Sequence, residues 1–316
     1  MVEKIAETLM KEDRILILFH ASPDGDAVGS AAALLRALLK MGKTAAVRCS
    51  DPVPEKLRFL LEDLESPEFE PDYIVAVDVA DIRLLGKLRE SYEDRIDLAI
   101  DHHAGHTNFA ETDFVDVKAA SNTEIIFRLL KAMNAEIDSK TADAVYTGLA
   151  TDTGCFKYRN VTANTHEIAA ELMRKGARAG EINHLMFEVQ SRGQLQAEVA
   201  VLQTMEFHFD GKCALMSVNC DIMEKYGLEE DDVNAYVSRP RMIEGVLAGI
   251  TLKQRDDKLV KISFRTNPPA NSSALAGLMG GGGHAGAAGC SFKGTLSEAR
   301  ETVLRHCGEY LAGLKI

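Results

Sequence analysis

The chain has 316 residues, 46% hydrophobic and 27% charged, a composition typical of globular proteins and unlike that of disordered chains. Its 48 acidic and 36 basic residues give a formal net charge of −12, which disfavours binding of long duplex DNA through bulk charge. No run of about 18 apolar residues occurs and the acidic start is unlike a signal peptide, so we expect no membrane span. The six cysteines form no Cys-x-x-Cys pair, which predicts a reduced, cytoplasmic protein without a disulfide framework.

The first half of the chain alternates short apolar runs with Ala- and Leu-rich helical patterns. The runs predict strands at residues 14–19, 44–48, 73–77 and 98–100. The patterns between and after them predict helices at 27–41, 82–90, 122–133 and 139–150. This alternation predicts an α/β domain with a mostly parallel sheet and helices on both faces.

The second half has a different pattern. A helical, polar-rich stretch at 180–206 precedes two predicted hairpins, 206–218 around Asp210-Gly211 and 242–264 around residues 254–258. Helices are predicted at 272–279 and 297–311. We therefore predict a smaller mixed α/β domain at 205–316, joined by a helical connector at 181–204 to a first domain at 1–180.

The first candidate motif joins His20, Asp24 and Asp26 on the turn between a predicted strand and helix. If the backbone is extended, the side chains of Asp24 and Asp26 point to the same side. Two carboxylates at such a short separation repel each other unless a cation lies between them. Asp26 alone would be interpreted as the N-cap of the helix. With His20 and a second carboxylate beside it, metal binding is favoured.

Polar residues also follow the third and fourth predicted strands, and ligands of open parallel sheets bind at the carboxyl ends of strands. Asp78 either binds a ligand there or caps the next helix. In Asp101-His102-His103, adjacent imidazoles are expected to point to different sides, so that one binds a metal and the other faces a phosphate. Asp152 ends a predicted helix, where its charge opposes the helix dipole; alone, it would be interpreted as a solvated loop residue.

Together these residues form a mixed set of histidines and carboxylates without cysteine. Six ligands suit two divalent ions about 3.5–4 Å apart, with one bridging carboxylate. The combination of imidazole with carboxylate favours Mn²⁺ over Mg²⁺. The predicted metal ligands are His20, Asp24, Asp26, Asp78, His102 and Asp152.

Four consecutive glycines, 280–283, precede His284 in the second half. They predict a backbone-exposed loop whose amides could bind an anion, with a flexible linker as the alternative. Arg241 and Arg265 are candidate partners for the same anion, and either could equally be a solvated surface arginine.

These motifs resemble those of the DHH phosphoesterase superfamily, in the family's order. The resemblance rests on His20-x-x-Pro23-Asp24-Gly25-Asp26, Asp78, Asp101-His102-His103, Thr151-Asp152-Thr153-Gly154 and, for the DHHA1 domain, Gly281-Gly282-Gly283-His284. It covers nearly the whole chain. It implies that residues 1–180 are a DHH catalytic domain and residues 205–316 a DHHA1 substrate-binding domain.

The resemblance also implies a role for each residue. One ion would be bound by His20, Asp24 and Asp78, and the second by Asp26, Asp78, His102 and Asp152. The catalytic group would comprise His103 facing the scissile phosphate, Asp101 orienting a histidine, and the bridging Asp78. Substrate would be held at its far end by Arg265, His284, Gly282, Gly283 and Arg241.

The compact two-domain form is similar to the oligoribonuclease (nanoRNase) and 3′-phosphoadenosine 5′-phosphate (PAP) phosphatase group. We therefore expect a two-metal phosphoesterase that hydrolyses short oligoribonucleotides, PAP or both. Three other substrates stay open: pGpG-like products of cyclic dinucleotides, polyphosphate and pyrophosphate. A non-catalytic role as a nucleotide-binding regulatory protein also stays open. The expected partners are short RNA or a nucleotide bisphosphate. We expect no binding to long duplex DNA or to a membrane. Whether the protein forms a homodimer stays open.

Overall fold

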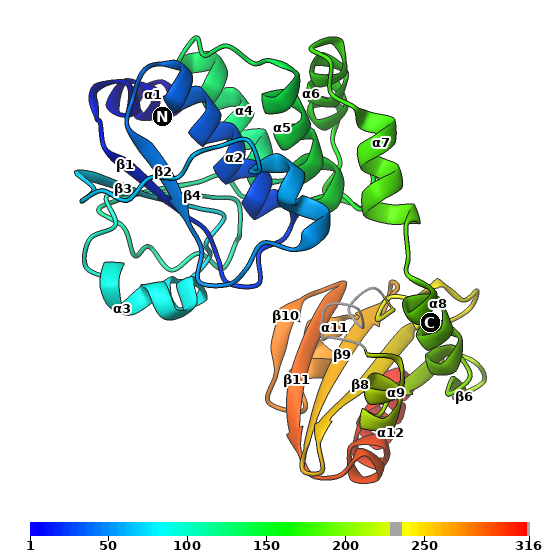
Figure 1. Cartoon of the computed structure of the whole chain (residues 1–316). Helices are drawn as coiled ribbons and strands as arrows, with labels where there is room; N and C mark the ends of the chain where they lie inside the picture. Colours follow the sequence, from blue (N-terminus) through cyan, green and yellow to red (C-terminus); the bar gives the residue numbers. More distant parts are fainter. Residues whose placement is uncertain (228–235, 315–316) are drawn as a thin grey trace. The chain divides into compact units, whose positions relative to one another are not determined.

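The computed structural model describes residues 1–227 and 236–314 (Figure 1). The chain divides into two compact units, Met1–Val189 and Gln190–Ile316, and each is described by itself. In the part of the chain that is described, no helix has the length and apolar character needed to cross a bilayer.

The first unit is built on a five-stranded parallel sheet. Its strands are β1 (Ile15–Leu18), β2 (Ala45–Arg48), β3 (Tyr73–Val77), β4 (Leu98–Asp101) and β5 (Thr112–Val115). They lie in the order β2-β1-β3-β4-β5, and every adjacent pair is parallel. The parallel sheet and the four predicted strands are confirmed. The fifth strand was not predicted, because this edge strand lacks a fully buried apolar run.

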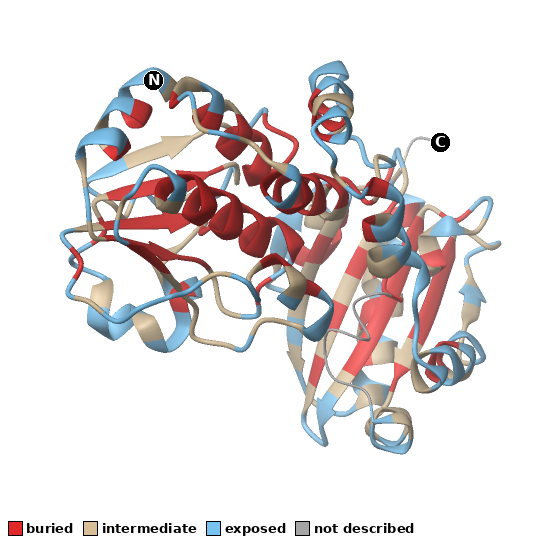
Figure 2. Ribbon diagram, turned by 45° about the horizontal axis from the view of Figure 1, so that its top comes forward, coloured by how far each residue is buried: buried red, intermediate tan, exposed pale blue. Residues whose placement is uncertain are grey.

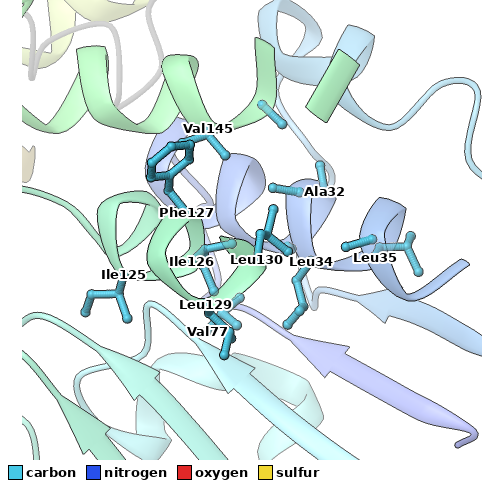
Figure 3. Close-up of a cluster of buried hydrophobic side chains, with 14 of the residues drawn as sticks. Ala32, Leu34, Leu35, Val77, Ile125, Ile126, Phe127, Leu129, Leu130 and Val145 are labelled. Atoms are coloured by element: carbon cyan, nitrogen blue, oxygen red, sulfur yellow. The ribbon is translucent and has the colours of Figure 1, made fainter. Parts of the chain in front are cut away.

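Long helices cover one face of this sheet. Of these, α2 (Gly25–Lys40) and α4 (Asn122–Ala132) contact the strands, and α1 (Val2–Lys11) packs on α4. A further layer, α5 (Ser139–Asp152), α6 (Ala163–Arg174) and the short α7 (Ala179–Asn183), packs on these helices. Leu34 of α2, Ile126 and Leu130 of α4, and Val77 of β3 belong to one buried cluster (Figure 3). Because α2 packs between the sheet and its neighbouring helices, it is buried along nearly its whole length (Figure 2).

Two glycines allow the close packing of α2 against α5. A Cβ at Gly29 would lie 2.4 Å from the carbonyl oxygen of Ala144. A Cβ at Gly148 would lie 2.4 Å from Cγ2 of Thr123 and 2.7 Å from Oδ1 of Asp26. Since the helices meet beside Asp26, their close packing positions one of the candidate ligands.

The opposite face of the sheet has thinner cover. Leu85, in the 3₁₀ segment η2 (Ile82–Leu88), packs with residues of the sheet's second face, next to the short helix α3 (Arg89–Tyr92). The helix predicted for 82–90 is therefore present, as a 3₁₀ helix that continues into the start of α3. Gly86, with φ of 59°, interrupts the segment, and this backbone conformation is not helical.

The second unit contains a six-stranded mixed sheet. Its strands are β6 (Glu206–His208), β7 (Cys213–Val218), β8 (Ala248–Asp256), β9 (Leu259–Thr266), β10 (Gly282–His284) and β11 (Ala287–Lys293). The order is β10-β11-β9-β8-β7-β6, and only β7 and β8 pair in parallel. Both predicted hairpins form, and β9 alternates buried and half-buried residues, seen as bands in Figure 2.

Helices cover both faces of this second sheet. Leu275 of α11 (Ser272–Gly277) and Val303 of α12 (Leu296–Ala312) pack with Ile250 and Phe264 on one face. On the other face, α8 (Arg192–Leu202) packs against β7, with α9 (Cys220–Tyr226) beside it. The predicted mixed α/β class is confirmed for this unit.

The prediction of an exposed glycine loop before His284 is wrong in one respect, because Gly282–His284 form the edge strand β10. This strand pairs antiparallel with β11, with Gly282 opposite Gly289 and His284 opposite Ala287. A Cβ at Gly283 would lie 2.6 Å from Cα of Ala288. Glycine is needed here for close approach to the neighbouring strand, a tertiary requirement that the glycine run alone does not reveal.

Candidate metal centre

Three strand ends and two helix ends meet at one edge of the parallel sheet. His20 follows β1, Asp78 follows β3 and His102 follows β4. The remaining two elements contribute Asp24 as the N-cap of α2, Asp26 in its first turn, and Asp152 as the last residue of α5. The structure thus brings all six predicted metal ligands together.

Asp78 lies between two groups of these side chains. Its Oδ2 is 3.8 Å from Nε2 of His20, which is also 3.8 Å from Oδ1 of Asp24. Its Oδ1 is 3.7 Å from Nε2 of His102. These separations exceed hydrogen-bond lengths but suit ligand atoms arranged around an ion. Each carboxylate oxygen of Asp78 therefore faces a different histidine, as a bridging ligand would.

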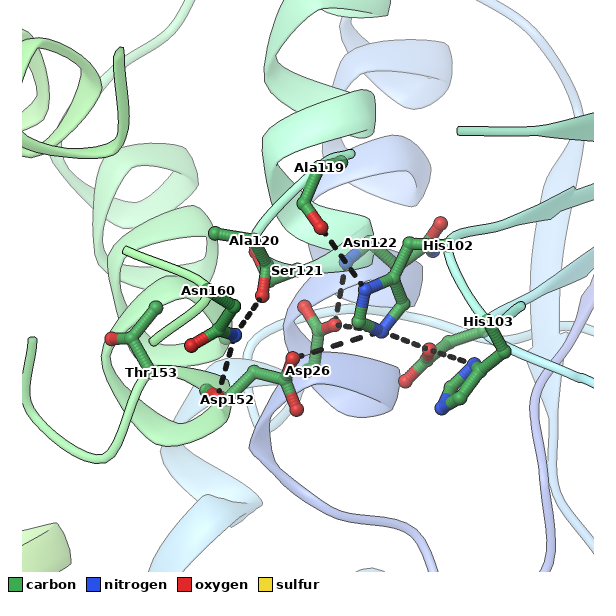
Figure 4. Close-up of polar contacts among 12 residues, drawn as sticks. Asp26, His102, His103, Ala119, Ala120, Ser121, Asn122, Asp152, Thr153 and Asn160 are labelled. Atoms are coloured by element: carbon green, nitrogen blue, oxygen red, sulfur yellow. Dashed lines mark hydrogen bonds and ion pairs between the residues drawn. The ribbon is translucent and has the colours of Figure 1, made fainter. Parts of the chain in front are cut away.

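The second group surrounds His102. Its Nε2 is 3.7 Å from Oδ2 of Asp26 and 3.6 Å from Oδ2 of Asp152 (Figure 4). The ligand atoms of His20, Asp24 and Asp78 lie within 4.8 Å of one another, and so do those of Asp26, His102 and Asp152. Asp78, His102 and His103 form a third such group, so three overlapping groups of possible metal ligands are present among the described residues.

Two buried atoms in this centre lack a hydrogen-bond partner among the described residues. They are Oδ1 of Asp78 and Nε2 of His102. Buried polar atoms are nearly always satisfied, and an unsatisfied pair facing each other needs an explanation. A divalent cation between them would satisfy both, so the residues present fit a metal site.

The electrostatics of the carboxylates point the same way. Burial, reinforced by the charges of Asp26 and Asp24, raises the pKa of Asp78 well above its ordinary value. Burial also raises the pKa of Asp26, and burial with the same neighbouring charges raises that of Asp152 to about 8. Without a counter-charge these carboxylates bind protons, and divalent cations would hold them ionised instead.

Backbone geometry fixes the orientation of these carboxylates. Oδ1 of Asp24 accepts hydrogen bonds from the backbone N–H groups of Asp26 and Ala27, at 2.9 and 3.0 Å. Asp24 is therefore the N-cap of α2, and the alternative prediction of Asp26 as the cap is wrong. Asp26 instead accepts hydrogen bonds from the amides of Asn122 and Thr123, at 2.6 and 2.9 Å, in the first turn of α4.

Asn122 is a supporting residue that the sequence reasoning missed. In the orientation that satisfies its partners, its side-chain amide donates to the carbonyl of Ile100 and accepts from Oγ of Ser30 and the backbone N–H of Asp78. It thereby links the ends of β3 and β4 to α2. The capping pattern Ser121-x-x-Glu124 was the available signal, since it places Asn122 at the start of a helix.

Asp101 lies behind the two histidines, fully buried. Its Oδ1 accepts from Nδ1 of His103 at 2.7 Å, and its Oδ2 pairs with Nδ1 of His106 at 2.9 Å. Burial alone would raise the pKa of Asp101, but the hydrogen bonds with the two histidines lower it overall. The hydrogen bond to Asp101 raises the pKa of His103, which favours its imidazolium form.

The two adjacent imidazoles do not point to different sides as expected. The ring centroids of His102 and His103 are 4.5 Å apart, and both rings approach Oδ1 of Asp78 at 3.7 Å. His106 of the same loop is a further supporting residue, to which the sequence analysis assigns no role. Its Nε2 lies 2.7 Å from Oδ1 of Asp113 on β5, the strand that was not predicted.

The predicted substrate-binding residues lie in one row across the second sheet. Arg265 of β9 pairs with Ala287 of β11, which pairs with His284 of β10. On its other side, Arg265 pairs with Gly249, whose Cβ would lie 2.6 Å from the backbone nitrogen of Arg241. Directly paired residues share a sheet face, so the two arginines and the histidine lie on the same face. Gly282 and Gly283 form the exposed edge strand beside them.

The fold and the site define a protein of the two-domain, divalent-metal-binding α/β class. Residues 14–149 match the model of the DHH family, N-terminal domain, and residues 210–313 match that of the DHHA1 domain. The chain belongs to the DHH family and carries a DHHA1 domain, as the motifs predicted.

Several known proteins are similar over nearly the full chain. The bifunctional oligoribonuclease and PAP phosphatase NrnA of Thermus thermophilus is 34% identical, covering 97% of this chain and 93% of the relative. The Bacillus subtilis protein of the same name is 25% identical, covering 92% and 93%. The crystal structure of an exopolyphosphatase-related protein from Bacteroides fragilis has a TM-score of 0.89 at 26% identity, covering 98% and 96%.

Proposed function

We propose that this protein is a metal-dependent phosphoesterase that hydrolyses short oligoribonucleotides and PAP. The observation that carries the proposal is the facing pair of unsatisfied buried atoms, Oδ1 of Asp78 and Nε2 of His102, inside a mixed His/Asp centre. The substrate class is supported by the similarity to the two proteins named oligoribonuclease and PAP phosphatase.

In this proposal the six ligands hold two divalent ions. His20 and Asp24 would hold one, Asp26, His102 and Asp152 would hold the other, and Asp78 would be shared by both. Bound there, two ions would supply Lewis acidity that activates a water and stabilises the phosphoryl oxygens. The two imidazole donors support Mn²⁺ as the preferred ion.

The chain's own residues complete the chemistry. His103 is 42% exposed at its side chain, so a substrate can reach it, and its imidazolium form can donate to a phosphoryl oxygen. Asp101 accepts from Nδ1 of His103 and leaves Nε2 of the same ring for the substrate. Asp101 is thus a positioning residue, and His103 is the catalytic residue that touches the phosphate.

The second unit supplies binding in this proposal. Arg265, His284 and Arg241, with the backbone of Gly282 and Gly283, would hold the part of the substrate that does not react. The net charge of −12 supports short substrates over long duplex DNA. We further propose a cytoplasmic location, which the six free cysteines support.

The test is a substrate panel with chelator-treated protein. We expect Mn²⁺ to restore hydrolysis of 5′-labelled RNA of two to about ten nucleotides, with rates falling steeply as length increases, since a protein with a net charge of −12 repels a long polyanion. PAP, pGpG and polyphosphate are measured beside the RNA. Preferred hydrolysis of pGpG or polyphosphate would replace the proposed substrate, and nucleotide binding without any hydrolysis would show a regulatory protein.

A further inference from the structure

The segment after Asp152 presents three exposed side chains beside the metal centre. They belong to Lys157, Tyr158 and Arg159. Within the described part of the chain, none of the three side chains makes a hydrogen bond or an ion pair, although most arginines of this acidic protein are paired. Two unpaired cations therefore flank one exposed aromatic ring.

The backbone of this segment is nevertheless firmly held. The N–H groups of Lys157 and Tyr158 both donate to the carbonyl of Thr153, at 2.9 and 3.0 Å. Nδ2 of Asn160 donates to the carbonyl of Asp152 at 3.1 Å (Figure 4). The segment is thus anchored to the backbone of a candidate metal ligand, so its exposed side chains extend from an ordered backbone that adjoins the metal centre.

Phe156 anchors the segment from the inside. Its ring stacks on that of His166, with centroids 5.4 Å apart and an interplanar angle of 23°. Its backbone N–H donates to Oγ1 of the buried Thr153 at 3.1 Å. One aromatic residue of the segment is thus used for packing, while the next one, Tyr158, remains 52% exposed.

Tyr158 lies flat against the backbone of Gly154, two residues beyond Asp152. A Cβ at Gly154 would lie 2.3 Å from Cζ and 2.4 Å from Cε1 of the tyrosine ring. Gly154 has φ of 57°, so both its conformation and its lack of a side chain allow this contact. One side of the ring is covered by this backbone, and its exposed surface remains available to a planar ligand.

We propose that Tyr158, with Lys157 and Arg159, forms a nucleotide subsite of the metal centre. A nucleobase of the substrate stacks on the tyrosine ring, and the two cations bind its phosphates. Aromatic rings flanked by basic side chains are the usual means of binding single-stranded nucleic acid without reading its sequence. The proposal rests on the proposed function, which it deepens by placing one substrate nucleotide on the first unit.

The decisive experiment removes a base of the substrate and the ring of Tyr158, first separately and then together. We would measure kcat/KM with Mn²⁺ for the dinucleotide pApA and for its two abasic analogues, each lacking one base. In the wild-type protein, loss of the stacked base should lower kcat/KM by about 5- to 100-fold, the range expected for one base–aromatic contact. In Tyr158→Ala the same base deletion should have little effect, whereas Tyr158→Phe should behave like the wild type.

A purely structural role of the ring predicts a different result. Tyr158→Leu keeps an apolar side chain that can cover Gly154 but removes the π face. We expect it to keep the metal content and melting temperature of the wild type while losing the base dependence. If Tyr158→Leu and Tyr158→Ala both retain the full effect of base deletion, the subsite is overturned.

The cations are tested against a matched arginine. Arg159→Ala should lower kcat/KM for pApA and reduce its salt dependence, because one phosphate contact is lost. Arg174→Ala is the control, because Arg174 is also exposed and unpaired within the described residues. It lies next to Gly176, whose Cβ would be 3.3 Å from Ser139 at the other end of α5, about 20 Å from Asp152. Equal effects of both variants would overturn the role of Arg159.

Binding measurements separate this proposal from the proposed function. Calorimetric titration of pApA and its abasic analogues in Ca²⁺ buffer reports stacking without requiring turnover. If the protein binds pApA with a Tyr158-dependent preference for the base but hydrolyses nothing, the proposed function is wrong and the subsite holds. If it hydrolyses pApA without that preference, or does not bind pApA at all, the subsite is wrong.

Discussion

The two units place their candidate functional residues in opposite environments. In the first unit, Asp26, Asp78 and Asp101 are buried at the ends of strands and the start of a helix. In the second unit, the glycines and His284 lie on an exposed edge strand. Buried carboxylates are costly unless a cation or a hydrogen bond compensates them, whereas exposed groups carry no such cost.

This difference predicts how the two regions respond to change. Substitutions in the metal centre should alter metal affinity, proton binding and stability together, because the same buried charges determine all three. Substitutions in the row of Arg265 and His284, which holds no buried charged cluster, should alter substrate binding alone. Each prediction below tests this separation, beginning with the largest expected effect.

Asp78→Asn should abolish hydrolysis, lowering kcat by at least about 1,000-fold, because an amide cannot bridge two cations with two charged oxygens. At neutral pH the metal-free variant should also be more stable than metal-free wild type, because the buried Asp78 must take up a proton on folding and an amide need not. Rate assays, metal analysis and thermal melts would check this. Substantial activity of the variant in the presence of chelator would contradict the two-metal site.

Arg265→Ala and His284→Ala should lower kcat/KM for dinucleotides by roughly 10- to 1,000-fold, as expected for loss of a charge-assisted contact with the substrate. Their metal content should stay that of the wild type. A small aryl phosphate ester lacks the distal nucleotide and should be hydrolysed at nearly the wild-type rate. Parallel losses on both substrates, with a lower melting temperature, would show that the edge strand is merely structural.

His106→Asn should have a smaller effect on the same reaction, about 10- to 100-fold in kcat, because it acts only through Asp101 and His103. KM should change little, which distinguishes loss of positioning from loss of binding. Asp113→Asn is the companion variant, since it keeps a hydrogen-bond acceptor for Nε2 of His106 but removes the charge. An unchanged kcat in both variants would show that this chain of hydrogen bonds only supports the fold.

Much of the first unit could be predicted because its signals are local. Short apolar runs mark buried parallel strands, and polar residues at their ends meet at one sheet edge. This rule alone placed His20, Asp78 and His102 near one another. The geometry also agrees with the family resemblance, which supplied the division of the six ligands between two ions.

The parts that were not predicted depend on tertiary contacts. β5 is an edge strand with few buried side chains, so its sequence carries little strand signal, and its pairing of Asp113 with His106 was invisible. Gly283 joins a strand because a neighbouring backbone approaches too closely for a side chain. Asn122 supports the centre only because the start of α4 packs against Asp26. The hydrophobic periodicity of a sequence carries no information about such contacts between distant segments.

The smallest predicted effect is a dependence of stability on pH that metal removes. In the metal-free protein the pKa of Asp152 is about 8 against an ordinary value of 3.8, and those of Asp26 and Asp78 are also raised, all chiefly by burial. At a pH between the ordinary pKa of such a carboxyl and its raised pKa in the folded protein, the folded protein retains a proton that the unfolded chain has released. The free energy of unfolding must therefore fall as pH rises through this window, by about 2 kcal/mol between pH 6 and 8 for Asp152 alone.

Thermal melts at pH 6, 7 and 8 would measure this dependence with chelator and with Mn²⁺. With the metal bound, the carboxylates are ionised throughout and the dependence should flatten, because binding has already displaced the protons. Asp152→Asn should flatten part of the dependence in the metal-free protein and raise its melting temperature at pH 8. A metal-free wild type whose stability is constant or rises from pH 6 to 8 would show that these carboxylates are ionised without metal. The metal centre would then not differ from the substrate-binding residues of the second unit in carrying buried charges that destabilise the metal-free fold.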